Sequence, residues 1–196
     1  QSAGGIARAL AGDVLTADEA TTALAGFAAS GASARAVIET LAGAAGGWFR
    51  ADVGKLALLH GDGAAVELAD MGAGEEHGRG RRDIAAADTA PRALTLAYYE
   101  PGRDYQAGVQ RAMRPGAGVR EARMELAAAI DAASAKTIAE AALMRLDMER
   151  ERRTVALPWG SLEVRPGERV TIAGAPGTWR VERWRLENMV VLLECV

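Results

Sequence analysis

The sequence predicts an α+β protein in which a small helix-plus-hairpin domain is followed by a strand-rich domain with one long helix and a small β-barrel-like C-terminal module. Three observations predict this class. A helical pattern leads directly into a hairpin pattern, a second helical pattern begins at Asp131, and short strand-like runs separated by tight turns follow Thr154. The predicted domains are residues 1–90, which end in a glycine-rich linker, and residues 91–196.

The first domain opens on residues 5–31, where small residues and short helical stretches leave the local structure ambiguous. A helix is predicted after Ser33, because the Ser33 hydroxyl can cap its first turn and Gly46-Gly47 can end it. Spacings of one, three and four residues place its apolar side chains on one face. These side chains are Val37, Ile38, Leu41 and Ala45.

A hairpin is predicted directly after this helix. Residues 48–51 and 55–60 have the composition of strands, and the turn between them ends in Gly54. Helix and hairpin together make a small α+β unit in which the helix packs on the sheet. Residues 61–91 are rich in glycine, alanine and charge, which suits a short strand near residues 65–69 and then a linker.

The second domain begins with a predicted strand over residues 92–100. Two Pro-Gly pairs predict a loop over residues 101–118, and alternation of apolar and charged residues predicts a second strand over residues 119–127. All three tyrosines of the chain lie in this region. Tyr98 and Tyr99 face opposite sides of one strand, so they cannot form a single stacking surface.

Asp131 starts the clearest helix of the sequence, and the position where its apolar stripe meets Glu149 predicts where the helix leaves its core. The stripe consists of Ala135, Ile138, Ala139, Ala142 and Leu146. After Thr154, four or five short strands with Pro-Gly, Gly or Glu-Asn turns predict a small barrel or a curled sheet. A change of face between Val181 and Trp184 predicts a β-bulge.

The composition argues against several classes of function. With a net charge of −3 and a pI near 5.5, the chain lacks the excess of cations that nucleic-acid binding requires. No apolar run approaches the roughly 18 residues of a membrane span. The single cysteine, Cys195, excludes an internal disulfide and a cysteine-based metal cluster, and its apolar surroundings predict a buried thiol.

No group of residues has the spacing of an active site. His60 ends a predicted strand, and His77 follows two glutamates as an isolated cluster without a second metal-ligating group. Spacing alone leaves a pair of carboxylates open for glycoside hydrolysis. The candidates, in turn or strand-edge positions, are Glu100, Asp104 and Glu163. The sequence therefore predicts no catalytic residue, no metal site, no cofactor and no enzymatic activity.

Three motifs in the second half resemble, in this order, the pattern of the putative phage tail protein family. They are a tyrosine-rich "YYEPGRDYQ", a "LP" that follows the alanine-rich helix, and "VRPGERV" opening the C-terminal strands. Their matching residues are Tyr99, Glu100, Pro101, Asp104, Tyr105, Gln106, Leu157, Pro158, Val164, Pro166, Gly167, Glu168 and Val170. The chain departs from the pattern where Glu100 follows Tyr99 directly. The helix and hairpin upstream also look like the family's, so the resemblance covers most of residues 25–196.

The resemblance implies a structural role in a phage-tail-like particle. Members of the family include host-specificity and baseplate-hub proteins of gene transfer agents, tailed phages and prophages. It implies a module of the hub at the tail tip, where several copies form a homo-oligomeric ring at the distal end of the tail tube. The implied partners are other tail or baseplate subunits and the remainder of a longer chain, since "QSAGG" reads as the start of a fragment. Such a protein is made in the bacterial cytoplasm and ends in the virion.

Two alternatives remain beside the assembly role. A carbohydrate- or peptidoglycan-binding module would use Trp159, Trp179 and Trp184 as exposed, coplanar stacking surfaces for a cell-surface glycan, whereas an assembly module would bury them. A hydrolase would need two carboxylates, or an acid and a histidine, converging within about 10 Å. "YYEPGRDYQ" is interpreted as a structural joint, so Tyr105→Ala should cost stability or assembly and leave no catalytic phenotype.

Overall fold

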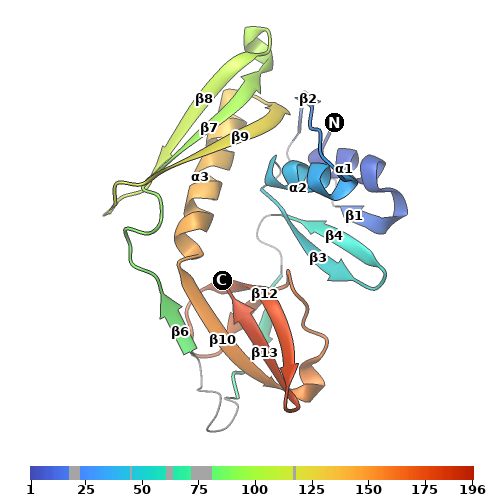
Figure 1. Cartoon of the computed structure of the whole chain (residues 1–196), viewed down its shortest axis with the longest axis vertical. Helices are drawn as coiled ribbons and strands as arrows, with labels where there is room; N and C mark the ends of the chain where they lie inside the picture. Colours follow the sequence, from blue (N-terminus) through green and yellow to red (C-terminus); the bar gives the residue numbers. More distant parts are fainter. Residues whose placement is uncertain (18–22, 45, 61–63, 72–80, 117) are drawn as a thin grey trace. The chain divides into compact units, whose positions relative to one another are not determined.

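The computed structural model describes residues 1–17, 23–44, 46–60, 64–71, 81–116 and 118–196. Three α-helices and three mixed sheets occupy this part of the chain, which confirms the strand-rich α+β class (Figure 1).

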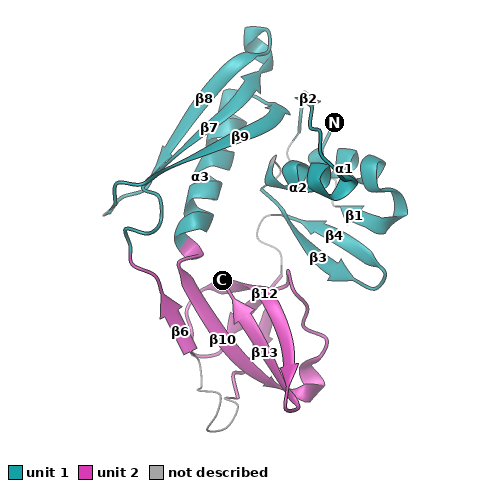
Figure 2. Cartoon of the chain, viewed as in Figure 1, with its two compact units in different colours: residues 1–61, 87–147 teal, residues 62–86, 148–196 magenta. Residues whose placement is uncertain are grey.

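The chain divides into two compact units, each built from two separate segments (Figure 2). Unit 1 contains Gln1–Gly61 and Ala87–Asp147, and unit 2 contains Asp62–Ala86 and Met148–Val196. The units differ in extent from the predicted domains, because each takes in chain from both sides of residue 90.

Unit 1 begins with α1 (Ala3–Ala11), most of which lies in the segment that the sequence left ambiguous. The Ser2 hydroxyl accepts a hydrogen bond from the Gly5 N–H at 3.1 Å and so caps the first turn of this helix. A 3₁₀ turn, η1 (Gly12–Val14), then leads into the short strand β1 (Leu15–Ala17).

The predicted helix and hairpin of unit 1 are confirmed as α2 (Ala34–Ala44), β3 (Trp48–Asp52) and β4 (Lys55–Leu59). The Ser33 hydroxyl accepts the Ala36 N–H at 3.3 Å, as expected of a helix cap. β1 joins the hairpin by pairing parallel to β4, which gives a three-stranded sheet in the order β1-β4-β3.

A second sheet of unit 1 has the order β2-β9-β7-β8 and holds the first family motif. Its strands are β2 (Gly26–Phe27), β7 (Ala93–Glu100), β8 (Gln106–Met113) and β9 (Glu121–Ala129). β7 pairs antiparallel with β8 and parallel with β9. The helix α3 (Ala132–Met148) follows, and it ends just before Glu149, where the sequence predicts it to leave its core.

The prediction of a continuous loop over residues 101–118 is wrong, because Gln106–Met113 in its middle form the strand β8. The first Pro-Gly pair forms only the short 3₁₀ turn η2 (Pro101–Arg103) at the tip of a hairpin, and the second lies beyond the end of the strand. The inward positions of β8 are the small residues Gly108 and Ala112, so its alternation is hidden in the sequence.

One apolar core joins the helices and sheets of unit 1. α3 contributes Ala135, Ile138, Ala139 and Leu143 to it, and Leu94 and Leu96 enter it from β7. Asp131 caps α3 as predicted, since its carboxylate accepts the Ser134 N–H at 2.9 Å and the Ser134 hydroxyl at 2.7 Å. These hydrogen bonds lower the pKa of Asp131 below its ordinary value.

Unit 2 is a six-stranded sheet in the order β5-β11-β12-β13-β10-β6. Its strands are β5 (Val66–Leu68), β6 (Arg81–Ile84), β10 (Glu151–Pro158), β11 (Arg169–Ile172), β12 (Thr178–Glu187) and β13 (Val190–Cys195). Residues 162–163 form a turn directly after the 3₁₀ segment η3 (Trp159–Ser161), so no strand lies between β10 and β11 in this fully described stretch. The predicted bulge is confirmed by a shift of register between Val181 and Arg183.

The sheet of unit 2 is curled and does not close into a barrel within the described residues, where β5 and β6 are its edges. The chain after β5 nevertheless reaches β10 near the other edge. The Ala156 N–H donates to the Asp70 carboxylate at 3.2 Å, and the Met71 N–H donates to the Ala156 carbonyl at 3.1 Å. We call this line of contact between the chain after β5 and β10 the seam.

Candidate functional site

The first family motif forms the closed end of the β7–β8 hairpin. Pro101 starts the 3₁₀ turn, and Asp104 and Tyr105 follow it in the left-handed region with φ of 56° and 58°. The Tyr105 N–H donates to the Glu100 carbonyl at 3.0 Å, and Glu100 pairs with Gln106 as the last rung of the ladder. The predicted structural joint is therefore a hairpin tip. Left-handed backbone is unfavourable for residues other than glycine, so Tyr105 occupies a strained position.

The tyrosines of β7 lie on opposite faces of the sheet, as predicted. Tyr98 is buried, with 3% of its surface exposed, and its hydroxyl donates to the Glu100 carboxylate at 3.3 Å. Gly108 lies directly against the Tyr98 ring, where an added Cβ would come within 2.5 Å of it. Tyr99 is 46% exposed on the other face. The two rings therefore have different surroundings, one a core and the other solvent.

The exposed side of this sheet carries an apolar row that the sequence did not reveal. Tyr99, Val109 and Met113 are 46%, 62% and 59% exposed. Register places them on one face, since Tyr99 pairs with Ala107, and Val109 and Met113 follow at outward positions of β8 with the exposed Arg111 between them. We call this row the outer face of unit 1. β8 is also the edge strand of the sheet, so the apolar row borders backbone groups with no neighbouring strand in the described residues.

The remaining motif residues support turns and core in unit 2. Pro158 ends β10, and Val170 of β11 is fully buried. Gly167 has a φ of 90°, and its N–H donates to the Val181 carbonyl at 2.7 Å. The Glu168 carboxylate accepts the Arg165 N–H at 3.0 Å. These contacts hold the turn before β11 against β12.

The three tryptophans of unit 2 do not form one exposed stacking surface. Trp179 is 8% exposed and lies beneath the Arg153 guanidinium, whose carbon is 5.0 Å from the ring centroid. Trp184 is partly buried against the core, with its Nε1 inaccessible. Trp159, at 58% exposed, is the one of the three that meets solvent broadly.

The groups considered for chemistry are scattered or buried. Among the residues that the structure describes, no three His, Cys, Asp or Glu side chains come together to hold a metal ion. His77 and the two glutamates before it lie outside the described residues. Cys195 is fully buried, as predicted, and burial raises its pKa to about 12. Glu100 and Asp104 lie at the tip of the hairpin, whereas Glu163 lies in a turn of unit 2.

The described helices include none long and apolar enough to cross a bilayer. The arrangement as a whole consists of ordered turns, exposed apolar faces and open sheet edges. Such features are compatible with contacts to other chains, and the motifs of the sequence indicate a phage tail protein.

A family model described as "Putative phage tail protein" matches residues 33–184. The chain therefore belongs to the putative phage tail protein family, whose members are structural components of tails. Comparison with curated protein sequences gives no match.

Solved structures share the fold. The chain is similar to a chain of the virion of a native gene transfer agent particle, with a TM-score of 0.82 and 24% identity over 98% of its length. It is similar to a tail protein from Neisseria meningitidis MC58 (TM-score 0.68, 15% identity) and to the 43 kDa tail protein of prophage MuSo2 from Shewanella oneidensis (0.62, 12%), both over its whole length. It spans 45% of the first of these chains and 66% of the other two.

Proposed function

We propose that this chain is a module of the hub at the tail tip or baseplate of a phage-like particle, and that it acts by assembly without catalytic turnover. In this proposal several copies form a ring at the distal end of the tail tube, joined to other tail subunits and to further parts of a longer chain. Family membership supports a structural role. The ring and its position at the tip are our inference.

The observation that carries the proposal is the outer face of unit 1. Val109 and Met113 leave about three fifths of their surfaces in solvent on an edge strand, and Tyr99 extends the row onto β7. Natural proteins protect exposed edge strands with charges, prolines or a covering element, because a bare apolar edge pairs with other chains. The β8 edge carries one exposed charge, Arg111, between two exposed apolar side chains, so it is only partly protected and offers apolar surface to a neighbouring subunit.

The hairpin tip supports the same reading. Tyr105 has 57% of its surface exposed and a backbone conformation that is unfavourable for a tyrosine. An exposed side chain in such a position contributes little to the stability of the isolated chain. A contact with a partner subunit would explain why an aromatic residue stands where glycine or asparagine would be less strained.

The test is incorporation of the full-length protein into particles. We expect the double substitution Val109→Lys with Met113→Lys to lower incorporation at least about tenfold, since two buried charges at an interface cost several kcal/mol. Its control is Val53→Lys, at an 82% exposed turn position of the β3–β4 hairpin, which should be incorporated normally.

Two results would count against the proposal. One is normal incorporation of the double variant, which would remove the outer face of unit 1 from the interface. The other comes from mass measurement of the parent complex: a protein found only as a free monomer would exclude a ring.

A second candidate function, glycan binding at the tail tip, is supported by the exposure of Trp159. Three more exposed apolar side chains, Leu162, Leu186 and Met189, occur in the same unit, and η3 contacts β13. In this case Trp159→Ala should abolish binding of particles to host cell-wall polysaccharide and leave their assembly unchanged. Unchanged binding would remove this candidate.

A further inference from the structure

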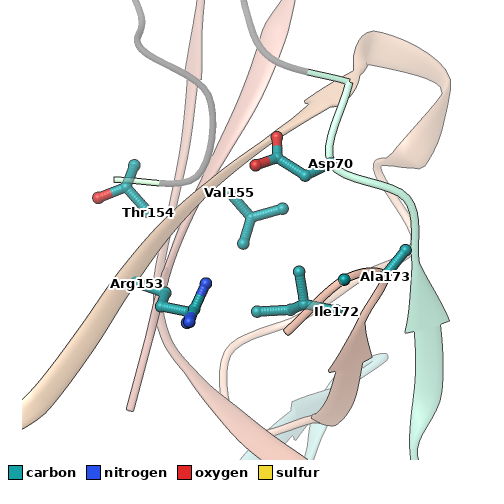
Figure 3. Close-up of a pocket in the computed structure, with 7 residues that line it drawn as sticks. Asp70, Arg153, Thr154, Val155, Ile172 and Ala173 are labelled. Carbon is teal, nitrogen blue, oxygen red and sulfur yellow. The ribbon is translucent and has the colours of Figure 1, made fainter. Parts of the chain in front are cut away.

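A small pocket opens at the seam of the curled sheet in unit 2. Its volume is about 250 Å³, and it lies between β10, the chain after β5 and the chain after β11 (Figure 3). The lining residues are Asp70, Arg153, Thr154, Val155, Ile172, Ala173 and Gly174. All of them belong to unit 2, so the pocket is a feature of one compact body.

Arg153 is the unusual member of this lining. It shares the inward face of β10 with Val155 and Leu157, which are core residues, and only 14% of its side chain is exposed. Its guanidinium stacks over the Trp179 ring. Its Nε is inaccessible to solvent and has no hydrogen-bond partner among the described residues. A largely buried cation with incomplete hydrogen bonding is costly unless another group completes it.

The carboxylate of Glu151, which forms an ion pair with Arg153, does not satisfy the Arg153 Nε. The Glu151 carboxylate lies 3.6 Å from the Arg153 Nε, which is beyond ordinary hydrogen-bond distance. Glu151 is bound more closely by Arg82 of β6, at 2.5 Å. The hydrogen bond from Arg82 is the main cause that lowers the pKa of Glu151. The charges of Arg82 and Arg153 contribute less, and a weak hydrogen-bonding interaction with Arg153, long at 3.6 Å, contributes least. Glu151 is therefore bound mainly by Arg82, and the Arg153 Nε is left without a hydrogen bond in the described part of the chain.

The other polar atoms around this core also lack acceptors. The indole Nε1 atoms of Trp179 and Trp184 are buried without a hydrogen-bond partner in the described part of the chain. Asp70 lines the pocket on a different side from Arg153, and its carboxylate accepts the Ala156 N–H. Neither tryptophan lines the pocket, so among its described lining residues the Arg153 guanidinium is the cation that an anion in the pocket would meet.

The walls of the pocket indicate the form of that anion. Figure 3 shows Arg153, Val155 and Ile172 directed toward the same space. Two branched aliphatic side chains beside one guanidinium suit a ligand with a short methylene stem and a terminal carboxylate. A carboxylate also matches the planar fork of arginine with two parallel hydrogen bonds.

We propose that this pocket receives the side chain of an acidic residue, with glutamate the better fit, from a neighbouring polypeptide of the tail. The carboxylate would bind the Arg153 guanidinium, and the stem would pack on Val155 and Ile172. The inference rests on the proposed assembly function for the source of the acidic residue. The pocket would be a second contact with a neighbouring polypeptide, in unit 2, separate from the outer face of unit 1.

The test is NMR titration of the isolated chain with N-acetyl-glutamate N-methylamide as the probe. We expect dose-dependent shifts of the backbone amides of Val155, Ile172 and Ala173. The glutamine analogue has the same shape without the charge and should bind at least about tenfold more weakly. Arg153→Gln should abolish the shifts, whereas Arg183→Gln, at a 67% exposed arginine on β12, should leave them unchanged.

One more variant and two comparisons between probes distinguish the proposal from its alternatives. Asp70→Asn should strengthen binding of the glutamate probe, because it removes a like charge from the pocket lining, and this holds even if Arg153→Gln fails to fold. Equal binding of both analogues, or binding that survives Arg153→Gln, would overturn the proposal. Acetate binding as tightly as the glutamate probe would indicate a site for a free small anion and would also overturn it.

The titration is independent of the ring, because it uses the isolated chain in solution. If the titration shows no binding but the Val109→Lys, Met113→Lys variant fails to enter particles, only the pocket proposal is rejected. A successful titration with normal incorporation of that variant would remove only the outer face of unit 1 as an assembly surface.

Discussion

The four-stranded sheet of unit 1 and the six-stranded sheet of unit 2 both expose side chains on the face away from their cores, but the chemistry of the two faces differs. Unit 1 exposes Tyr99, Val109 and Met113 toward its β8 edge. The same face also carries charged residues, namely Arg111 on β8 and Glu121, Arg123 and Glu125 on β9. Unit 2 exposes ion pairs that run across its strands. They are Arg152–Glu182 at 2.7 Å, Arg185–Glu194 at 3.3 Å and Arg183–Glu194 at 3.8 Å.

The difference indicates which face is adapted to solvent. Paired charges on a strand surface are well hydrated and disfavour association with another apolar sheet, although each pair adds little stability. Apolar side chains at an edge strand have the opposite effect, because covering them removes apolar surface from water. The apolar row of unit 1 includes one charged residue, Arg111, which lies between Val109 and Met113 and pairs with Glu121. We therefore expect the outer face of unit 1 to meet a partner and the charged face of unit 2 to remain hydrated.

The largest expected change in the free energy of unfolding comes from comparing substitutions on the inner and outer faces of the unit 1 sheet. Leu96 is fully buried on the inner face of β7, so Leu96→Ala should lower the free energy of unfolding by roughly 2–5 kcal/mol. Val109→Ala, on the outer face of the neighbouring strand, should change it by less than about 0.5 kcal/mol. Chemical denaturation of both variants measures the difference, and similar losses would mean that the outer face is already covered in the isolated chain.

A smaller change, an increase in the free energy of unfolding, is expected from a substitution at the tip of the β7–β8 hairpin. Tyr105→Gly relieves the left-handed strain and should raise the free energy of unfolding by up to about 1 kcal/mol, while particle assembly decreases. Tyr105→Ala keeps the strained backbone and removes an exposed ring, so its loss should appear in assembly rather than in stability. The sequence alone led us to expect that Tyr105→Ala would cost either stability or assembly, and the structure favours assembly. Destabilisation of the isolated chain by Tyr105→Gly would show that the ring supports the fold.

How much of the molecule the sequence predicts depends on how local the signals are. Ser33 and the glycines after α2 define that helix, and the turn before β4 defines the hairpin, so both were predictable. The pairing of β6 with β10 and of β5 with β11 joins segments about 70 to 105 residues apart and leaves no local signal. β8 was missed because its inward residues are small.

The sequence of β10 at the seam contains a signal from which an inward-facing arginine could have been predicted. Arg153 has the same parity as Val155 and Leu157 along β10, which predicts an inward-facing arginine in a strand of core residues. The partner of its guanidinium, the ring of Trp179 on another strand, could not be read from spacing. Sequence patterns therefore identify an unusual side chain more readily than they identify what surrounds it.

The smallest expected effect concerns the pair that joins an edge of unit 2 to its neighbouring strand. The Arg82 guanidinium holds the pKa of Glu151 below its ordinary value, so the folded state binds a proton there less readily than the unfolded state. Its contribution to stability is present above the unfolded pKa and is lost as the pH falls through the folded pKa. Because both side chains are partly exposed, the loss should be less than about 1 kcal/mol.

Glu151→Gln isolates this contribution. Its unfolding free energy should lie slightly below that of the native chain at pH 7, and the two should converge as the pH falls into the acid range. Arg81–Asp83, an ion pair within the same edge strand, provides the control: Asp83→Asn removes a charge that does not join β6 to β10 and should have a smaller effect at pH 7. A gap between Glu151→Gln and the native chain that persisted unchanged in acid would mean that Glu151 acts through packing. The charge of the pair would then have no part in holding β6 to β10.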